Sequence, residues 1–378
     1  MLSRSALFGA VVFFASQAGA QPWRAVVVAR APGSEVFSAA PVQARVGERV
    51  TLAAVLTGPR GRVVGPPISV RLGARVVRAE PFAAGVQTRW LRVVPRMEHV
   101  DTPSPNAGLS SFSNAVLFGP RHGRWLGYDR LEYETRALAP DEAAPTPEGL
   151  LTAERATLTA PHDGAGSMWF SAEVTLPDGA VVRAADGSTV DRLGLSRSVA
   201  RVSFRSDDGY LGWLSTYFGV PNVFGSNGAG GDHQSDRYTG ADCADVLVGA
   251  LRAMGNRAVP YLSVAQIGEA AARVTGVLTL DGAGQVRAAS GAVVTLRWGR
   301  DVLPGDLVTL GYRDDPGNSL PRAWDHIGAL VRDDNGDGAL DGADILRHMG
   351  GRGLEDATFL HAGPMQIAVW RWRAPRGR

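Results

Sequence analysis

The sequence predicts a chain of α+β class, with a β-sandwich over residues 21–200 followed by an α+β unit over residues 201–378. Short alternating or β-branched runs, separated by Gly and Pro, follow one another from Trp23 to about Ala200 and are typical of antiparallel strands. After Arg201 the sequence changes to apparent helices, a glycine-rich loop and a strand-rich end. A chain of 378 residues is long enough for two such domains.

The first 20 residues have the composition of an export signal. Arg4 precedes an apolar run from Ala6 to Ala15, and the small residues Ala18 and Ala20 precede a cleavage point. We therefore expect an exported protein, periplasmic or secreted. No later segment approaches the roughly 20 apolar residues of a transmembrane helix, so no membrane span is expected after cleavage. Arginines supply all the basic residues, the formal net charge is +2, and the arginines are scattered, so a nucleic-acid partner is not expected.

The predicted sandwich is built from runs such as "RVTLAAVL" and "SMWFSAEVTL". Their spacing is typical of an immunoglobulin-like module, although the sequence determines neither the number of strands nor their topology. We expect this domain to bind or position the substrate of the second one.

The single cysteine, Cys243, begins a predicted helix. Asp242 is placed to cap the helix, Asp245 lies where a carboxylate returns to the first amides, and Gly255 ends it. The apolar positions form one stripe, with Cys243 at its edge: Val246, Leu247, Ala250, Leu251 and Met254. A helix N-terminus favours thiolate over thiol, so we expect a lowered pKa for Cys243. Because one cysteine cannot form an internal disulfide in an exported protein, a nucleophile is favoured over a small buried apolar side chain.

Two histidines follow on predicted neighbouring strands. His326 begins "HIGALV" and His348 lies in "DILRHMGG". Antiparallel pairing of these strands would place both imidazoles on one face, with His326 as general base and His348 orienting it. His361, in "FLHAG", is the alternative third residue.

The order "GVPNVFGSNG", "GADCADVLV", "LPGDLVTL", "DHIGALV" and "ILRHMGG" resembles the NlpC-type branch of the papain-like cysteine peptidases and amidases. The resemblance covers about residues 211–350. It implies a papain-like α+β domain, hydrolysis of an amide or peptide bond in the bacterial cell wall, and no organic cofactor. Carried over by position, Cys243 is the nucleophile, His326 the base and His348 the orienting residue, and the Cys243 amide helps to hold the oxyanion.

The chain departs from this family pattern at two positions. Ala244 stands where the family has Ser, and Asn222 stands where an aromatic residue is expected after Pro221. The Asn222 amide can still donate to an oxyanion. Asn222 and Asp242 are therefore the candidates for oxyanion or substrate contacts.

The segment "DDNGDGALDGAD" between the two histidine strands has the spacing of a calcium loop. Glycine at position 6, Gly338, permits the sharp turn. The predicted oxygen ligands are Asp333, Asn335, Asp337, the backbone carbonyl of Ala339, Asp341 and Asp344. A structural Ca²⁺ is expected to hold the hairpin of His326 and His348. The alternative is a polar turn without a metal.

Two other functions remain open. The stretch "CADVLVGALRAMGNRAVPYLSV" also resembles the cysteine helix of transglutaminase-like acyl transferases, although "PGDLV" before "DHIGAL" favours the NlpC type. A non-catalytic, calcium-binding envelope scaffold with a degenerate papain-like domain is the other alternative, supported by Asn222 and Ala244. The leading prediction is an exported cysteine hydrolase whose partner is a cell-wall peptide or another envelope substrate. The sequence does not give its oligomeric state.

Overall fold

The computed structural model describes residues 23–98, 130–146, 149–160, 162–223, 225–226, 228–229, 231–312, 324–350, 353–359 and 364–373. The predicted export signal and His361 lie outside these residues.

The chain is mostly β, with 45% of its residues in strands and 11% in helices. The predicted α+β, papain-like class is therefore wrong, and the protein is closer to the all-β class. The reason lies in the C-terminal part of the chain. Besides the three strands that carry the motifs "LPGDLVTL", "DHIGALV" and "ILRHMGG", further short strands join the same large sheet.

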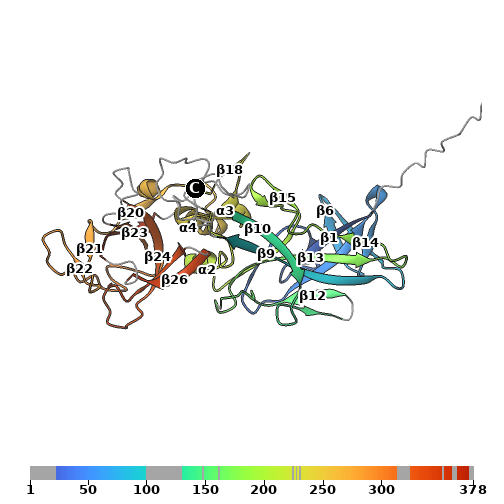
Figure 1. Ribbon diagram of the computed structural model, residues 1–378, viewed down its shortest axis with the longest axis horizontal. Helices are drawn as coiled ribbons and strands as arrows, with labels where there is room; N and C mark the ends of the chain where they lie inside the picture. Colours follow the sequence, from blue (N-terminus) through green and yellow to red (C-terminus); the bar gives the residue numbers. More distant parts are fainter. Residues whose placement is uncertain are drawn as a thin grey trace, which may run out of the picture.

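Two sheets in the N-terminal half pack face to face (Figure 1). The first has the central order β11-β12-β4-β1-β2-β6-β7. Its strands are β1 (Arg24–Arg30), β2 (Val36–Ser38), β4 (Val50–Thr57), β5 (Val63–Gly65), β6 (Ser69–Leu72), β7 (Arg75–Arg78), β8 (Glu80–Pro81), β11 (Ala144–Pro145) and β12 (Leu150–Ala153).

The second sheet has the order β10-β9-β13-β17-β3, with β14 at the edge of β13. Its strands are β3 (Val42–Arg45), β9 (Gln87–Glu98), β10 (Arg130–Ala137), β13 (Gly166–Thr175), β14 (Val181–Arg183) and β17 (Ala200–Arg205). A core of buried apolar residues fills the space between the two sheets, including Leu52 and Ala54 from the first and Phe170 and Val202 from the second. Two short hairpins lie outside the large sheets: β15 (Val190–Asp191) with β16 (Gly194–Leu195), and β18 (Gly228–Ala229) with β19 (Asp232–His233).

The third sheet lies in the C-terminal half and has the order β22-β21-β27-β23-β24-β25-β26, with β20 also paired to β27. Its strands are β20 (Ala271–Arg273), β21 (Leu278–Leu280), β22 (Val286–Arg287), β23 (Leu307–Tyr312), β24 (His326–Arg332), β25 (Ile345–Gly350), β26 (Gly353–Thr358) and β27 (Met365–Trp372). All neighbours in this sheet are antiparallel. The predicted strands that begin at His326 and contain His348 are confirmed as neighbours.

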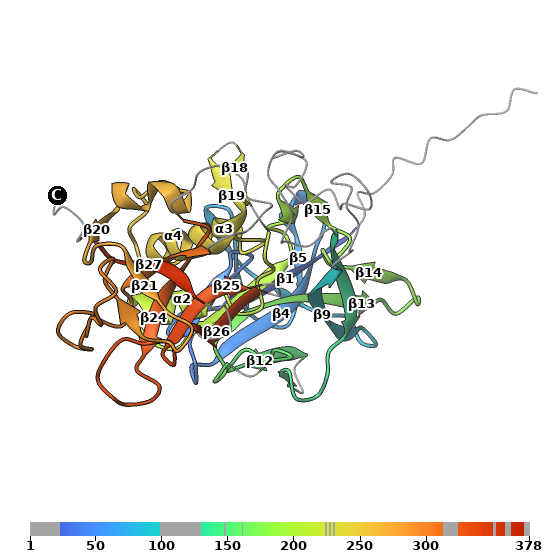
Figure 2. The same cartoon turned by 60° about the vertical axis from the view of Figure 1, so that its left-hand side comes forward.

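Three α-helices of the described chain lie between this sheet and the N-terminal strands, as the two views in Figures 1 and 2 show. They are α2 (Tyr210–Ser215), α3 (Gln234–Arg237) and α4 (Cys243–Ala253). Single 3₁₀ turns occur at Pro59–Gly61 and Val264–Glu269.

The helix α4 begins and ends where the sequence predicts. The Asp242 carboxylate accepts hydrogen bonds from the amides of Ala244 and Asp245, and Gly255 follows the helix with a positive φ of 120°. Four of the five predicted stripe residues are buried, whereas Met254 is 38% exposed. The helix is therefore buried over more of its circumference than a single apolar stripe predicts.

A central core surrounds α4 and joins the helices to the second and third sheets. It contains Trp169 from the second sheet, Tyr217 just after α2, Leu247 from α4 and Ile327 from the third sheet. The predicted boundary near residue 200 stays a prediction, but the residues before and after it share this core. Residues from both halves of the chain therefore pack around α4 and Cys243.

Candidate functional site

The two predicted histidines lie together at the edge of the central core. The Nε2 atom of His326 is 2.9 Å from the Nδ1 atom of His348, and the two rings meet edge to face with their centroids 4.9 Å apart. His348 lies directly opposite Gly328 in the strand pairing, so His326 and His348 are diagonal neighbours on one sheet face. The hydrogen bond uses Nε2 of His326, so Nδ1 is the ring nitrogen left for other contacts.

Gly328 makes this arrangement possible. A Cβ atom at this position would lie 2.9 Å from the Cβ of His348 and 2.7 Å from the Cγ of Leu346. Any larger residue would push β25 away from β24 and separate the two imidazoles.

Glu355 extends the histidine pair by one strand. It stands directly opposite His348 in the pairing of β25 with β26, and its Oε1 atom is 3.9 Å from Nε2 of His348. This carboxylate is not among the site residues that the sequence predicts. The tight hairpin "HMGGRGLE" carried the signal, because pairing Gly350 with Gly353 brings Glu355 across from His348.

The cysteine thiol packs against the start of the histidine strand. Cys243 is partly buried at the rim of the central core, as predicted, and its sulfur accepts a hydrogen bond from the backbone of Ile327, the residue after His326. The structure therefore places Cys243 next to the strand that carries His326, and His326 next to His348, but among the described residues no hydrogen bond joins the thiol to His326. Their catalytic roles stay predictions.

The predicted lowering of the thiol pKa is wrong. Burial raises the pKa of Cys243 well above its usual value, and the negative charges of Asp242 and Asp245 raise it further. Asp242 accepts hydrogen bonds from two of the free amides at the helix N-terminus, so this helix end is less positive than an uncapped one. At neutral pH the thiol is protonated.

The pKa of His326, the predicted general base, is shifted in the opposite direction. Burial, and then the neighbouring charge of His348, lower the pKa of His326 to about 3. His326 is therefore a neutral imidazole at neutral pH. A neutral imidazole beside a neutral thiol can accept a proton, so the resting site is a thiol and a base rather than an ion pair.

Asn222 and Asp242 link the two sides of the site. The Asn222 Nδ2 atom donates to the Gly350 carbonyl at the end of β25, over 2.8 Å, and Asn222 pairs with Ala241 as a parallel bridge. The second carboxylate oxygen of Asp242 accepts from the Gly225 amide. Both side chains thus connect the cysteine helix to its surroundings, and the carboxylate of Asp242 is engaged entirely by backbone amides. Ala244 is only 2% exposed in the central core, so a polar side chain at this position would be buried.

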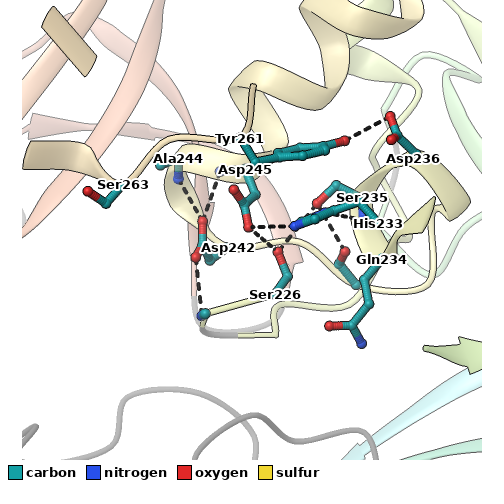
Figure 3. A network of polar contacts seen from close by, with 12 residues as sticks. Ser226, His233, Gln234, Ser235, Asp236, Asp242, Ala244, Asp245, Tyr261 and Ser263 are labelled. Atoms are coloured by element: carbon teal, nitrogen blue, oxygen red, sulfur yellow. Dashed lines mark hydrogen bonds and ion pairs between the residues drawn. The ribbon is translucent and has the colours of Figure 1, made fainter. Parts of the chain in front are cut away.

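A second polar network lies on the other side of the first turn of α4. Figure 3 shows Asp245 between Ser226 and His233, with the Tyr261 ring lying on the imidazole. Ser226 donates a short hydrogen bond to Asp245, and Nε2 of His233 is 3.8 Å from the same carboxylate oxygen. Asp245 therefore does not return to the helix amides as the sequence predicted.

The carboxyl of Asp245 and the imidazole of His233 in this network are both neutral at neutral pH. Burial, and then the charge of Asp242, raise the pKa of Asp245 to about 8. Burial lowers the pKa of His233 to about 4. The network is thus uncharged around the first turn of the cysteine helix.

The carboxylates of the predicted calcium loop accept hydrogen bonds from amides of the loop and from Trp298. Asp333 accepts from the amides of Gly336 and Gly338, and the buried Asp344 accepts from the Trp298 indole. In the part of the chain that the structure describes, no group of three or more His, Cys, Asp or Glu side chains is placed to hold a metal. The residues do not form a ready metal centre, and calcium stays a prediction.

Comparisons with protein-family models, with curated proteins and with solved structures found no match for this chain. The resemblance to the NlpC-type enzymes therefore rests on the short motifs alone. Among the described residues, no helix is long and apolar enough to cross a membrane.

The raised pKa of Asp245 predicts a specific pH dependence of stability. Between about pH 4 and pH 8 the folded protein keeps a proton on Asp245 that the unfolded chain has lost, so Asp245 lowers stability as the pH rises through this window. Asp245→Asn cannot ionise. We expect its free energy of unfolding to gain on the wild type by about 1 kcal/mol per pH unit between pH 5 and 8.

Urea unfolding at several pH values measures this difference. Asp178→Asn, on an exposed turn, is the matched control and should follow the wild-type profile. A constant difference between Asp245→Asn and wild type at all pH values would contradict the assignment.

Proposed function

We propose that this protein is an exported cysteine hydrolase that cleaves an amide or peptide bond, with Cys243 as nucleophile, His326 as general base and His348 as positioning residue. The observation that carries the proposal is the hydrogen bond of 2.9 Å between His326 and His348, next to the strand position that contacts the Cys243 sulfur. A nucleophile, a base and a group orienting the base are the three parts such catalysis needs.

The pKa shifts define how the nucleophile is activated. The thiol proton passes to Nδ1 of neutral His326 as sulfur attacks the carbonyl carbon of the substrate, forming the C–S bond. The imidazolium then gives this proton to the leaving nitrogen as the C–N bond breaks, which leaves a thioester. Water, deprotonated by His326, hydrolyses the thioester and restores the thiol. The hydrogen bond to His348 occupies Nε2 of His326 and leaves Nδ1 for the thiol proton.

The first turn of α4 supplies a donor for the oxyanion. The Asp242 carboxylate takes the amides of Ala244 and Asp245, and within the described chain no acceptor is found for the Cys243 amide. This amide can bind the developing oxygen charge. Asn222 already donates to Gly350, so it acts as a positioning residue that ties β25 to the segment before Cys243.

Bacterial cell-wall peptide is the proposed substrate class, and the envelope or the extracellular space is the proposed location. The support is the composition of residues 1–20 and the motif resemblance. Both bond type and location are open to direct assay.

Variants of the three residues test the mechanism with purified peptidoglycan. Cys243→Ala and His326→Ala should each lower kcat/KM by at least about 10³-fold, since nucleophile and general base have no substitute here. His162→Gln, which changes a histidine stacked on Phe218 outside the site, is the control and should keep most of the activity. Hydrolysis by a folded Cys243→Ala variant at the wild-type rate would refute the proposal.

The role of His348 has its own signature. His348 contributes to the low pKa of His326, so His348→Gln should move the acid limb of the pH–rate profile upward from about pH 3. Burial is the larger cause and remains, so the limb should stay below the ordinary pKa of histidine. A purely structural role for His348 would lower activity without moving this limb.

One observation favours a non-catalytic role as the second candidate. The raised pKa of Cys243 leaves little thiolate at neutral pH, as in an inert buried cysteine. A scaffold of this kind would show no covalent intermediate with any acyl donor. An acyl transferase, by contrast, would pass the acyl group to an added amine in preference to water.

A structural calcium ion in the loop of residues 333–344 is a separate proposal, supported by the ligand spacing. The loop joins β24 to β25, so an ion there would stabilise the strands of His326 and His348. Thermal unfolding with CaCl₂ and with EGTA tests it. At about 100 times Kd, calcium should add roughly 2.7 kcal/mol, and Asp337→Asn with Asp341→Asn should remove the effect. Equal melting temperatures in CaCl₂ and EGTA would rule it out.

A further inference from the structure

A small cavity lies between the second sheet and the segment of α3, away from the residues of the proposed active site. Its volume is about 30 Å³, and its walls include Trp169, Leu195, Arg197, Arg201, Asp236 and Arg237. Three guanidinium groups and one carboxylate therefore surround it.

Most of these charges have partners of their own. Arg237 forms a two-bond ion pair with Asp191, at 3.0 and 2.9 Å. Arg197 pairs with Asp232. The carboxylate in the wall, Asp236, is bound by Arg252 and by the Tyr261 hydroxyl. None of these pairs leaves a free negative charge for the cavity.

Arg201 is the exception. It is only 8% exposed, and no carboxylate of the described residues lies within ion-pair distance of it. Its guanidinium lies on the Tyr238 ring, 3.8 Å from the centroid, and donates to the Ser203 hydroxyl. These neutral contacts fix its position without balancing its charge, and a buried unbalanced charge is unfavourable.

Arg237 adds a second unused donor. Its side chain is buried, and its Nε–H has no hydrogen-bond partner among the described residues. Buried donors of this kind are rare because each loses its hydration without compensation. Arg201 thus has no negatively charged partner among the described residues, and Arg237, although paired with Asp191, keeps one Nε–H that the described residues do not satisfy.

We propose that this cavity binds a carboxylate group, held by Arg201 and Arg237. A water-sized group needs about 10–15 Å³, so the cavity has space for the two oxygen atoms of a carboxylate. Arginine pairs with carboxylates through two parallel hydrogen bonds. Trp169 and Leu195 provide apolar walls that can contact the carbon end of such a ligand. An anion with oxygen atoms on all sides, such as sulfate, would make no favourable contact with these walls. The site is independent of Cys243 and of the proposed hydrolase activity.

Calorimetric titration of the purified chain with sodium formate, at pH 7 and constant ionic strength, tests the site. We expect saturable binding with a Kd on the order of 10 mM, and acetate binding of similar strength. Sulfate should bind at least about 10-fold more weakly because the cavity is too small for it. Arg201→Met should lower formate affinity at least about 10-fold.

Arg205→Met is the matched control, because Arg205 lies on the same strand, pairs with Asp208 and does not line the cavity. It should bind formate like the wild type. If Arg201→Met fails to fold, Arg201→Lys keeps the charge but loses the planar fork, and it should also bind less tightly. Absence of formate binding to the wild type, or equal binding by a folded Arg201→Met, would overturn the proposal and leave the cavity to water.

Discussion

The fold and the site both depend on the burial of α4 between the second and third sheets. Val246 and Leu247 have no exposed surface, and burial of each such side chain contributes roughly 1.5–3 kcal/mol. Gly249 allows the Tyr217 ring to approach the helix, because a Cβ there would overlap the phenol oxygen. Cys243 is the first residue of α4, and this end of the helix contacts β24 at Ile327. Without this packing, Cys243 would not be held against β24, the strand that begins at His326.

Burial also determines the electrostatics of the site. The groups closest to the first turn of α4 are all shifted toward their neutral forms: the thiol of Cys243, the imidazoles of His326 and His233, and the carboxyl of Asp245. A site of this kind holds no unpaired charge at rest. In the proposed mechanism, charge develops when the thiol proton moves to His326, and the Cys243 amide is the proposed donor to that charge.

Local features of the sequence predicted local features of the structure. The Asp242 cap involves residues two and three positions apart, and the pairing of β24 with β25 follows from one hairpin. The class of the fold depended on distant pairing instead, because in the described chain β20 and β21 join the sheet through β27, near the end of the sequence. The predicted direction of the Cys243 pKa shift was wrong for the same reason. Its burial depends on contacts such as that with Ile327, which no pattern around the cysteine contains.

Acylation by an activated ester tests the central claim most directly, because it does not depend on the natural substrate. With p-nitrophenyl acetate, the wild type should release nitrophenolate and carry the acetyl group on Cys243, located by mass spectrometry. His326→Ala should acylate at least about 10²-fold more slowly, because the thiol then has no base. Equal acylation rates in wild type and His326→Ala, or an acetyl group only on other residues, would contradict the account of Cys243 and His326 as a nucleophile and its base.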